Sequence, residues 1–502
     1  MATTTPTGNN PLAMFPPPRY ISASILCAFG GFLLGIDTSI IGPTTIMKSF
    51  VSDFGTLSSA VHGLIVSMIL LSAAVSSFFA GKLADSLGRV PAIALGAAVL
   101  CLGVALEAGA VHIGMFAAGR LIEGFGYGAF FATQTVYICE ISPPTVRGPL
   151  TSLPQFLICV GLVVGYFTCY GTASLPGSLS WRLPFIVLAV LSALYVVLTL
   201  SLLPASPRWL IENGRQNEAD KIWDMLEIKH EDRLVVEQEI RLEQVNEIVE
   251  TTAAHSAPSS ATFKDMFTPE TRERTMLAVF MMGFLQLCGI DAVLYQYAPL
   301  LFQQAGLASE EASFLASGVS GIAIVVSSVP ALLLADRWGR RTSVLIGGIS
   351  LSVTMALMAA LYAANTVHAG EGTARFIVIA CIYVYCITVA ATWGVTIKVY
   401  APEIQPQQTR AQATSLAYGV NWLANWFVVF VSPIMLERSS SAAYFLFAAC
   451  TAIATVVCFV FMVETRGAAL DEVEERFKLA SECRRLLVSK MLSSALRRRQ
   501  TG

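Results

Sequence analysis

The feature that most constrains the fold is a series of long apolar segments. A helix that crosses the hydrocarbon core of a bilayer needs about 20 predominantly apolar residues. Segments of this kind occur at 20–46, 58–80, 92–112, 114–138, 149–170, 183–203, 274–301, 312–335, 343–363, 374–400, 411–435 and 441–463. Only 13% of the 502 residues are charged, whereas a soluble protein carries about 25%. The sequence therefore predicts an all-α polytopic membrane protein with twelve transmembrane helices.

The apolar segments fall into two groups of six, separated by a charged stretch. The predicted divisions are a disordered N-terminus (1–18), an N-terminal six-helix bundle (19–203), a helical insert (204–273), a C-terminal six-helix bundle (274–465) and a C-terminal tail (466–502). Arginine is concentrated in alternate loops, and the loops rich in Lys and Arg of a membrane protein normally face the cytosol. We therefore expect both termini and the insert to be cytosolic. The expected location is the plasma membrane.

Two motifs recur in the same order in both halves. A-D-x-x-G-R ends at Arg89 and again at Arg340, each time after the second helix of its half. E-I-x-P-x-x-x-R ends at Arg147 and at Arg410, each time after the fourth helix. Repeated six-helix units of this kind predict two pseudo-symmetric bundles with a substrate site at their interface.

The repeated motifs supply a set of charged residues at one end of the predicted bundles. An Arg side chain can pair with a carboxylate on a neighbouring helix through two parallel hydrogen bonds. We expect a cytosolic gate that latches one conformation, and favour it over a static topology anchor. Its members are Asp85, Arg89, Glu140, Arg147, Asp336, Arg340, Glu403 and Arg410.

The seventh apolar segment carries unusually many polar residues. Gln286, Asp291 and Tyr295 lie within the run 281–302. A polar group in hydrocarbon is costly, so such residues normally face a bundle interior or a wet cavity. This segment is predicted to form a wall of a substrate pathway.

A series of motifs resembles the sugar porter family of the major facilitator superfamily, in its fungal forms. They are GIDTSIIG (35–42), GKLADSLGR (81–89), GRLIEGFGYG (119–128), YICEISPPTVRG (137–148), QFLICVGLVVGY (155–166), WRLP (181–184), PASPRWLIENGR (204–215), QLCGIDAVLYQYAPLLF (286–302), ADRWGRR (335–341), EIQPQQTR (403–410), NWLANW (421–426) and VETRG (463–467). The resemblance implies a carrier that alternates between outward-open and inward-open states. It also implies a cytosolic helical insert at 204–273.

The resemblance implies proton coupling through Asp37 and Arg120, which match a pair found in the proton symporters of the family. A carboxylate beside Arg stays ionised, and separation from the Arg during transport would let it take a proton. The other interpretation is a permanent structural ion pair in a uniporter. Glu123 lies one helical turn from Arg120 and is an extra acid that can share this Arg; its role is left open.

The family pattern also supplies the substrate contacts. Amide side chains bind sugar hydroxyls, and aromatic rings pack on the apolar face of a sugar ring. The matching residues are Gln155, Gln286, Tyr295, Trp422 and Asn425. An amide in a transmembrane helix can instead only bridge two helices, but the motif context favours binding for Gln155 and Gln286.

Several positions depart from the family. Three positions lack the polar or aromatic residue that contacts the sugar in the family, namely Leu285, Gln296 and Ile324. Two others carry a charge instead: Asp291 takes the place of an Asn, and Lys398 takes the place of a Trp. Asp291 and Lys398 can pair across the central cavity and leave it neutral, which we favour slightly. In the other arrangement Lys398 faces a carboxylate of the substrate.

The sequence thus predicts a secondary active transporter of a sugar or polyol that works by alternating access with proton symport. The alternatives are a transporter of a sugar acid, quinate-like acid or secondary metabolite, and a non-transporting sugar sensor. The expected partners are a small-molecule substrate, protons and the lipid bilayer, with no nucleic acid and a monomeric state. No phosphate-binding loop or nucleophile motif occurs, so neither a cofactor, a metal nor an enzymatic activity is predicted.

Overall fold

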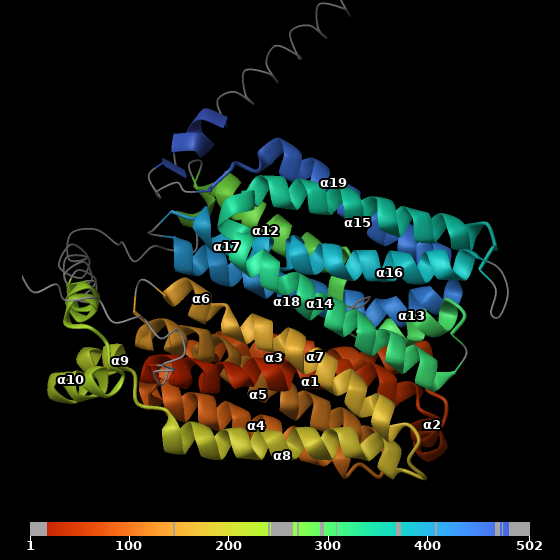
Figure 1. Ribbon diagram of the computed structural model, residues 1–502, viewed down its shortest axis with the longest axis horizontal. Coiled ribbons are helices and arrows are strands. Elements are labelled where there is room, and N and C mark those ends of the chain that lie inside the picture. The colour runs from red at the N-terminus through yellow and green to blue at the C-terminus, as the bar shows by residue number, and fades with distance from the viewer. Residues whose placement is uncertain are drawn as a thin grey trace, which may run out of the picture.

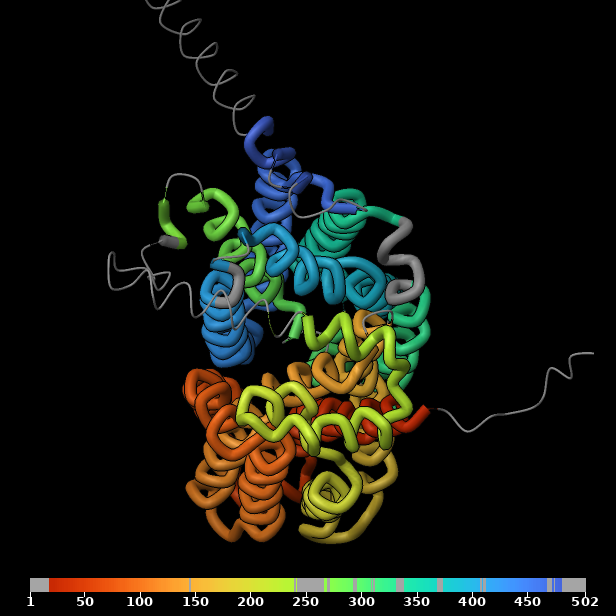
Figure 2. Tube along the Cα trace, turned by 90° about the vertical axis from the view of Figure 1, so that its left-hand side faces the viewer, coloured from red at the N-terminus to blue at the C-terminus, as the bar shows by residue number. Residues whose placement is uncertain are grey.

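The computed structural model describes residues 18–143, 146–238, 241, 265–268, 271–291, 296–307, 309–367, 373–406, 409–466, 472–473 and 475–480. The described residues form helices joined by short connections. The helices lie in two bundles, one above the other in Figure 1, with the N-terminal half in red to yellow and the C-terminal half in green to blue. An orthogonal view separates the same two bundles (Figure 2). This division confirms the predicted all-α architecture of two helical bundles.

The N-terminal bundle contains six long helices and two short ones. The long helices are α1 (Arg19–Ile46), α3 (Ser59–Leu87), α4 (Arg89–Ala108), α5 (Ile113–Ile141), α7 (Leu153–Thr172) and α8 (Leu179–Leu202), and the short ones are α2 (Lys48–Phe54) and α6 (Arg147–Thr151). Each of these long helices overlaps one of the six predicted segments, and the largest difference is at the end of α3, which reaches Leu87 where the predicted segment ends at 80.

The C-terminal bundle contains the counterparts of the other six segments. Its helices are α12 (Arg272–Leu287), α13 (Ala298–Gln304), α14 (Glu310–Trp338), α15 (Arg340–Ala363), α16 (Ala374–Ala391), α17 (Trp393–Glu403), α18 (Arg410–Arg438) and α19 (Ser440–Phe461). Among the described residues of both bundles, ten helical stretches are long and apolar enough to cross a membrane. The remaining two predicted spans correspond to α5 and to the divided pair α12 and α13.

Two predicted spans are broken in mid-segment. In the seventh, α12 ends at Leu287 and is followed by a turn in which Gly289 has φ +82°, and α13 begins at Ala298. The tenth breaks at Thr392 (φ −129°, ψ −81°), between α16 and α17. A break frees backbone polar groups, which a membrane protein tolerates only where protein or a wet cavity surrounds them. Both breaks therefore mark segments that face the interior of the molecule.

Contacts between the two bundles include those of α3 with α18 and of α7 with α14. At one end, α1 also approaches the C-terminal bundle: Gly42 lies directly against the backbone oxygen of Gln296. Next to it, Thr45 Oγ1 is 2.8 Å from His62 Nε2, and the His62 ring packs edge-on against Tyr297 with centroids 5.6 Å apart. We call this contact the closed end.

The charged insert begins with two short helices, α9 (Pro207–Glu212) and α10 (Gln216–Met225). They lie at the end of the molecule opposite α2 and α13 (Figure 1). The Trp209 indole nitrogen donates a hydrogen bond to the backbone oxygen of Asp85 at 2.9 Å and thereby attaches α9 to the end of α3. Most of the remaining insert, the first 17 residues and the last 22 lie outside the described residues.

Candidate transport site

A fully buried charge cluster lies inside the N-terminal bundle, on α1, α4 and α5. Arg120 Nη1 is 2.5 Å from Asp37 Oδ1, 2.9 Å from Glu123 Oε2 and 3.7 Å from Glu107 Oε2. No side chain of the four is more than 2% exposed. The structure thus brings the predicted pair Asp37 and Arg120 together and adds Glu123 to it. The role of the pair in proton coupling stays a prediction.

Glu107 was missed by the sequence reasoning. It occurs near the end of an apolar segment, where an acid is easily taken for a solvated helix-terminal residue. Two glycines explain how it reaches Arg120: a Cβ at Gly119 would lie 2.6 Å from Glu107 Cγ, and a Cβ at Gly103 would lie 2.7 Å from the Glu123 Cα. These glycines let α4 and α5 approach closely, so that Glu107 is directed at the charged residues of α5.

A cavity of about 710 Å³ lies between the bundles. The residues that line it are Phe131, Thr135, Thr151, Ser152, Pro154, Gln155, Arg340, Gly394, Val395, Lys398, Val399, Pro402, Glu403, Tyr418, Thr465 and Val473. Its walls include the first residues of α7 and α15 and the last residues of α17, which meet at the end that carries the insert. The volume is within the usual range for small-molecule sites, about 300–1,000 Å³.

Gln155 and Lys398 bridge the two bundles at this cavity. Lys398 Nζ donates a hydrogen bond of 3.2 Å to Gln155 Oε1, which joins α17 to α7. An ammonium group and an amide that face the same cavity can both bind oxygen atoms of a ligand. The structure therefore places two of the predicted substrate-binding residues in one cavity.

Asp291 has a different partner. Asn425 Nδ2 donates a hydrogen bond of 2.5 Å to Asp291 Oδ2. Among the ion pairs of the described residues, none joins Asp291 to Lys398, although Lys398 lies near enough for its charge to act on Asp291. The direct pairing that we slightly favoured is therefore not the arrangement in this structure.

Gln286 is held by a residue that the sequence analysis did not single out. Its Nε2 lies 3.5 Å from Asn421 Oδ1, and Asn421 Nδ2 donates to the backbone oxygen of Met282 at 2.7 Å. Asn421 is one helical turn before Asn425 in the NWLANW motif, which is the signal that identifies it. Among the described residues, the buried acceptors Gln286 Oε1 and Asn425 Oδ1 have no donor. Neither residue is among those that line the cavity, so the part of Gln286 and Asn425 in binding stays a prediction.

Two further residues were predicted to bind the substrate, Trp422 and Tyr295. Trp422 is partly buried against the hydrophobic core of the protein. Tyr295 lies outside the described residues. The contribution of both to binding stays a prediction.

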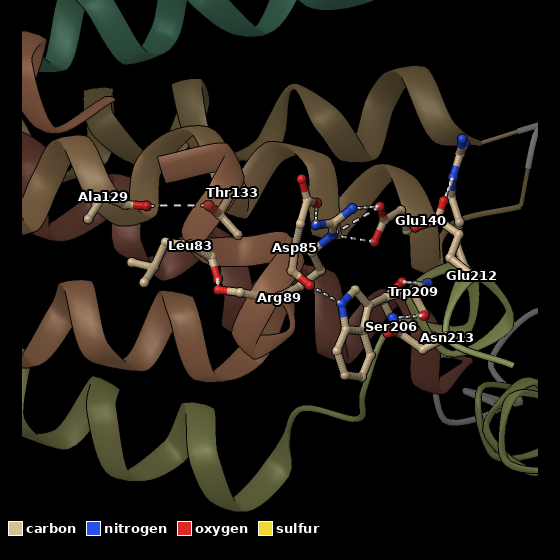
Figure 3. Close-up of polar contacts among 12 residues, drawn as sticks. Leu83, Asp85, Arg89, Ala129, Thr133, Glu140, Ser206, Trp209, Glu212 and Asn213 are labelled. Carbon is tan, nitrogen blue, oxygen red and sulfur yellow. Dashed lines mark hydrogen bonds and ion pairs between the residues drawn. The ribbon is translucent and has the colours of Figure 1, made fainter. Parts of the chain in front are cut away.

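The predicted gate residues of the N-terminal half form one cluster at the cavity end. The Arg89 guanidinium is hydrogen-bonded to Asp85 and lies 3.1 Å from Glu140 Oε1 (Figure 3). The same figure shows Trp209 of α9 against the backbone of Asp85. Arg147 begins α6 at the same end, between α5 and α7.

The C-terminal half has an equivalent cluster. Arg340 Nη2 lies 3.3 Å from Glu403 Oε1, and Thr465 donates a hydrogen bond of 2.9 Å to Glu403 Oε2. Glu464 accepts hydrogen bonds from the backbone nitrogens of Arg340 and Arg341 and caps the start of α15. The side chains of Asp336 and Arg410 lie outside the described residues. Each of these contacts joins residues of the same half.

The chain matches the family described as "Sugar (and other) transporter" over residues 23–477. It belongs to that family. Within the family it is similar to the low-affinity glucose transporter HXT3 of Saccharomyces cerevisiae, with 29% identity over 480 residues that cover 91% of this chain and 82% of the relative. The high-affinity glucose transporter of Kluyveromyces lactis is 28% identical over 475 residues, which cover 91% of this chain and 84% of the relative.

The fold of this family member is also that of solved structures. The inward-open conformation of the xylose transporter XylE from Escherichia coli superposes with a TM-score of 0.73 at 24% identity, covering 91% of this chain and 99% of that chain. The proton:xylose symporter XylE bound to 6-bromo-6-deoxy-D-glucose gives 0.72 at 24% identity, covering 91% and 98%. The chain is therefore a multi-pass membrane protein with the major facilitator fold, and its family is one of transporters.

Proposed function

We propose that this protein is a secondary active transporter that moves a sugar or polyol across the membrane, together with protons, by alternating access. The observation that carries the proposal is a cavity that residues of both bundles line. Gln155 of one bundle and Lys398 of the other meet at this cavity. A site on the boundary of two repeats can be exposed to either side when the bundles rock.

The buried ion pair of Asp37 with Arg120 supports proton coupling. Charged groups inside a membrane protein are costly and normally serve transport or relay of ions. The curated relatives are named as glucose and hexose transporters, and one solved structure is named as a proton:xylose symporter. These names support a sugar as the substrate and a proton as the coupling ion.

Uptake in cells that lack their own sugar transporters tests the proposal. We expect labelled D-glucose, D-xylose or a labelled polyol to accumulate against its gradient, and a protonophore to reduce the final ratio to about one. Asp37→Asn should abolish accumulation but retain exchange of labelled for unlabelled substrate, because exchange needs no net movement of protons. Accumulation that a protonophore does not change would contradict the proton mechanism.

A second candidate substrate is a sugar that carries a carboxylate. The observation that favours it is the hydrogen bond of Lys398 to the neutral amide of Gln155, whereas Asp291 is bound by Asn425. An ammonium group that faces a cavity without an acid bound to it can pair with a carboxylate of the substrate.

Competition and a double-mutant cycle separate the two candidates. If the substrate is acidic, D-gluconate should compete with uptake better than D-glucose, and Lys398→Gln should remove this preference. If Lys398 instead serves Asp291 during the transport cycle, Lys398→Ala combined with Asp291→Ala should be less damaging than Lys398→Ala alone. Equal damage by the single and the double variant would rule out that coupling.

The family and the loop charges support the remaining parts of the proposal. The insert and both termini face the cytosol, so the cavity is open to the inside, and the location is the plasma membrane. The clusters around Arg89 and Arg340 close against each other when the carrier faces outward. The protein acts as a monomer, since each chain contains both bundles and the site between them.

A further inference from the structure

The charge cluster on α1, α4 and α5 is unbalanced. If all its groups were ionised, three carboxylates, Asp37, Glu107 and Glu123, would surround the single cation Arg120. Their nearest oxygen atoms lie within 4.8 Å of one another, and all three side chains are buried. Like charges this close in a low-dielectric interior cannot all stay ionised. The cluster must therefore hold additional positive charge.

Arg120 does not satisfy the three acids equally. Its Nη1 atom carries two hydrogens, and Asp37 Oδ1 at 2.5 Å and Glu123 Oε2 at 2.9 Å accept them. Glu107 Oε2 is 3.7 Å away, and neither oxygen of Glu107 has a hydrogen-bond donor among the described residues. Glu123 Oε1 is likewise without a partner among the described residues. If both carboxyl groups were ionised, these buried acceptors would have no donor, whereas a proton on either group can be donated to the other.

A second unsatisfied group lies on the same face of α5. Tyr127, one turn after Glu123, is 2% exposed, and its hydroxyl has no hydrogen-bond partner among the described residues. The charges that act on this hydroxyl are those of Asp37, Glu107, Arg120 and Glu123. The same groups are the charges around Glu107 and Glu123. The site therefore contains a carboxyl pair, an unused hydroxyl and the Asp37–Arg120 ion pair.

We propose that Glu107 and Glu123 form a second proton-binding site, which is occupied in the conformation described and lies beside Asp37. The two carboxyl groups share one proton in a hydrogen bond between them. A bound metal ion fits less well, because it would lie about 2.0–2.6 Å from the carboxylate oxygens and hence next to the guanidinium of Arg120. The proposal rests on the proposed function and deepens it, because Asp37 can receive its proton from within the cluster.

Infrared spectroscopy of the purified full-length protein tests the site without a substrate. Wild-type protein at neutral pH should show the carbonyl stretching band of a protonated carboxylic acid. Glu107→Gln should remove one carboxyl group's share of this band, because glutamine keeps the shape but holds no acidic proton. Glu140→Gln is the matched control: Glu140 is buried but paired with Arg89, so its removal should leave the band unchanged. Should Glu107→Gln fail to fold, Glu123→Gln must still shift or remove the band.

Three results would overturn the proposal: absence of the band from the wild-type protein, no change in either variant, and loss of the wild-type band when sodium chloride replaces choline chloride at constant pH. The last result would assign the carboxylates to a cation. A protonophore-insensitive uptake would contradict the proposed proton symport but leave the band in place, so the two failures are distinguishable.

Discussion

At the scale of single residues, Arg89 binds two carboxylates that differ widely in exposure. The side chain of Glu140 is 5% exposed, while that of Asp85 is 69% exposed. Water screens the exposed pair and contributes its own hydrogen bonds, so such pairs stabilise little. The buried contact of Arg89 with Glu140 should therefore account for most of the stabilisation.

We predict that Glu140→Gln lowers the free energy of unfolding by about 1.5–3 kcal/mol, the range for hydrogen bonds to charged groups. Asp85→Asn should change it by less than about 1 kcal/mol. The measurement is thermal unfolding of each purified variant in the same detergent. Equal destabilisation by the two substitutions would show that exposure does not decide the strength of these pairs.

The charge cluster shows what the sequence reveals about individual residues. Asp37 and Arg120 could be predicted because each interrupts an apolar segment and belongs to a motif. Glu107 could not be assigned to the same cluster, since its contact with Arg120 depends on the close approach of α4 and α5 at Gly103 and Gly119. The partners of Asp291 and Lys398 depend in the same way on distances across the cavity, which no one-dimensional pattern contains.

At the scale of elements, α1 and α7 are held together by glycines. A Cβ on Gly161 of α7 would lie 3.0 Å from the Cα of Gly35 on α1 and would also meet the backbone oxygen of Phe32. Backbone atoms cannot move aside as a flexible side chain does, so the helices would have to separate. Gly171, on the same helix, has open space around its missing Cβ.

Gly161→Ala should therefore destabilise the protein by about 1–3 kcal/mol, the usual cost of an overpacked contact. Gly171→Ala should leave the stability unchanged or raise it slightly, since Ala favours a helix over Gly by roughly 0.5–1 kcal/mol. The midpoint of thermal unfolding distinguishes the variants. A normal midpoint for Gly161→Ala would mean that α1 and α7 can separate without cost.

Most helices could be predicted from hydropathy because a bilayer demands a fixed length of apolar chain. The breaks in the seventh and tenth spans do not show in the hydropathy pattern. Gly289 adopts a positive φ that favours glycine, so its residue type was a signal in the seventh span. In the tenth span the break falls at Thr392, before the buried Trp393, and the surrounding apolar run gives no sign of it.

At the scale of the whole molecule, the closed end depends on a contact in which Gly42 of one bundle meets the backbone of the other. The absent side chain of Gly42 lets α1 reach the backbone oxygen of Gln296 in the other bundle. A larger residue would keep the bundles apart here and favour the conformation that is open at this end. The larger residue would raise the free energy of only one state of the transport cycle, and the fold of each bundle would be unaffected.

We predict that Gly42→Val shifts the population away from the conformation described by about 5- to 150-fold, which corresponds to a cost of about 1–3 kcal/mol in that state. Uptake should fall accordingly. A cysteine introduced as Thr151→Cys, on the wall of the cavity, should react more slowly with a water-soluble thiol reagent in the Gly42→Val background. Gly171→Val serves as the control, and unchanged reactivity in both would contradict the prediction.

The cavity that reaches Lys398 also has an electrical consequence. Water in an open cavity brings the potential of that side deep into the protein, so the membrane voltage falls mainly across the remaining closed part. A charge moved through the full voltage gains or loses about 2.3 kcal/mol per 100 mV. When the bundles rock, the positive charge of Lys398 moves from the electrical potential of one side of the membrane to that of the other side. We therefore expect the membrane voltage to act directly on the conformational equilibrium of the carrier, even when the site is empty.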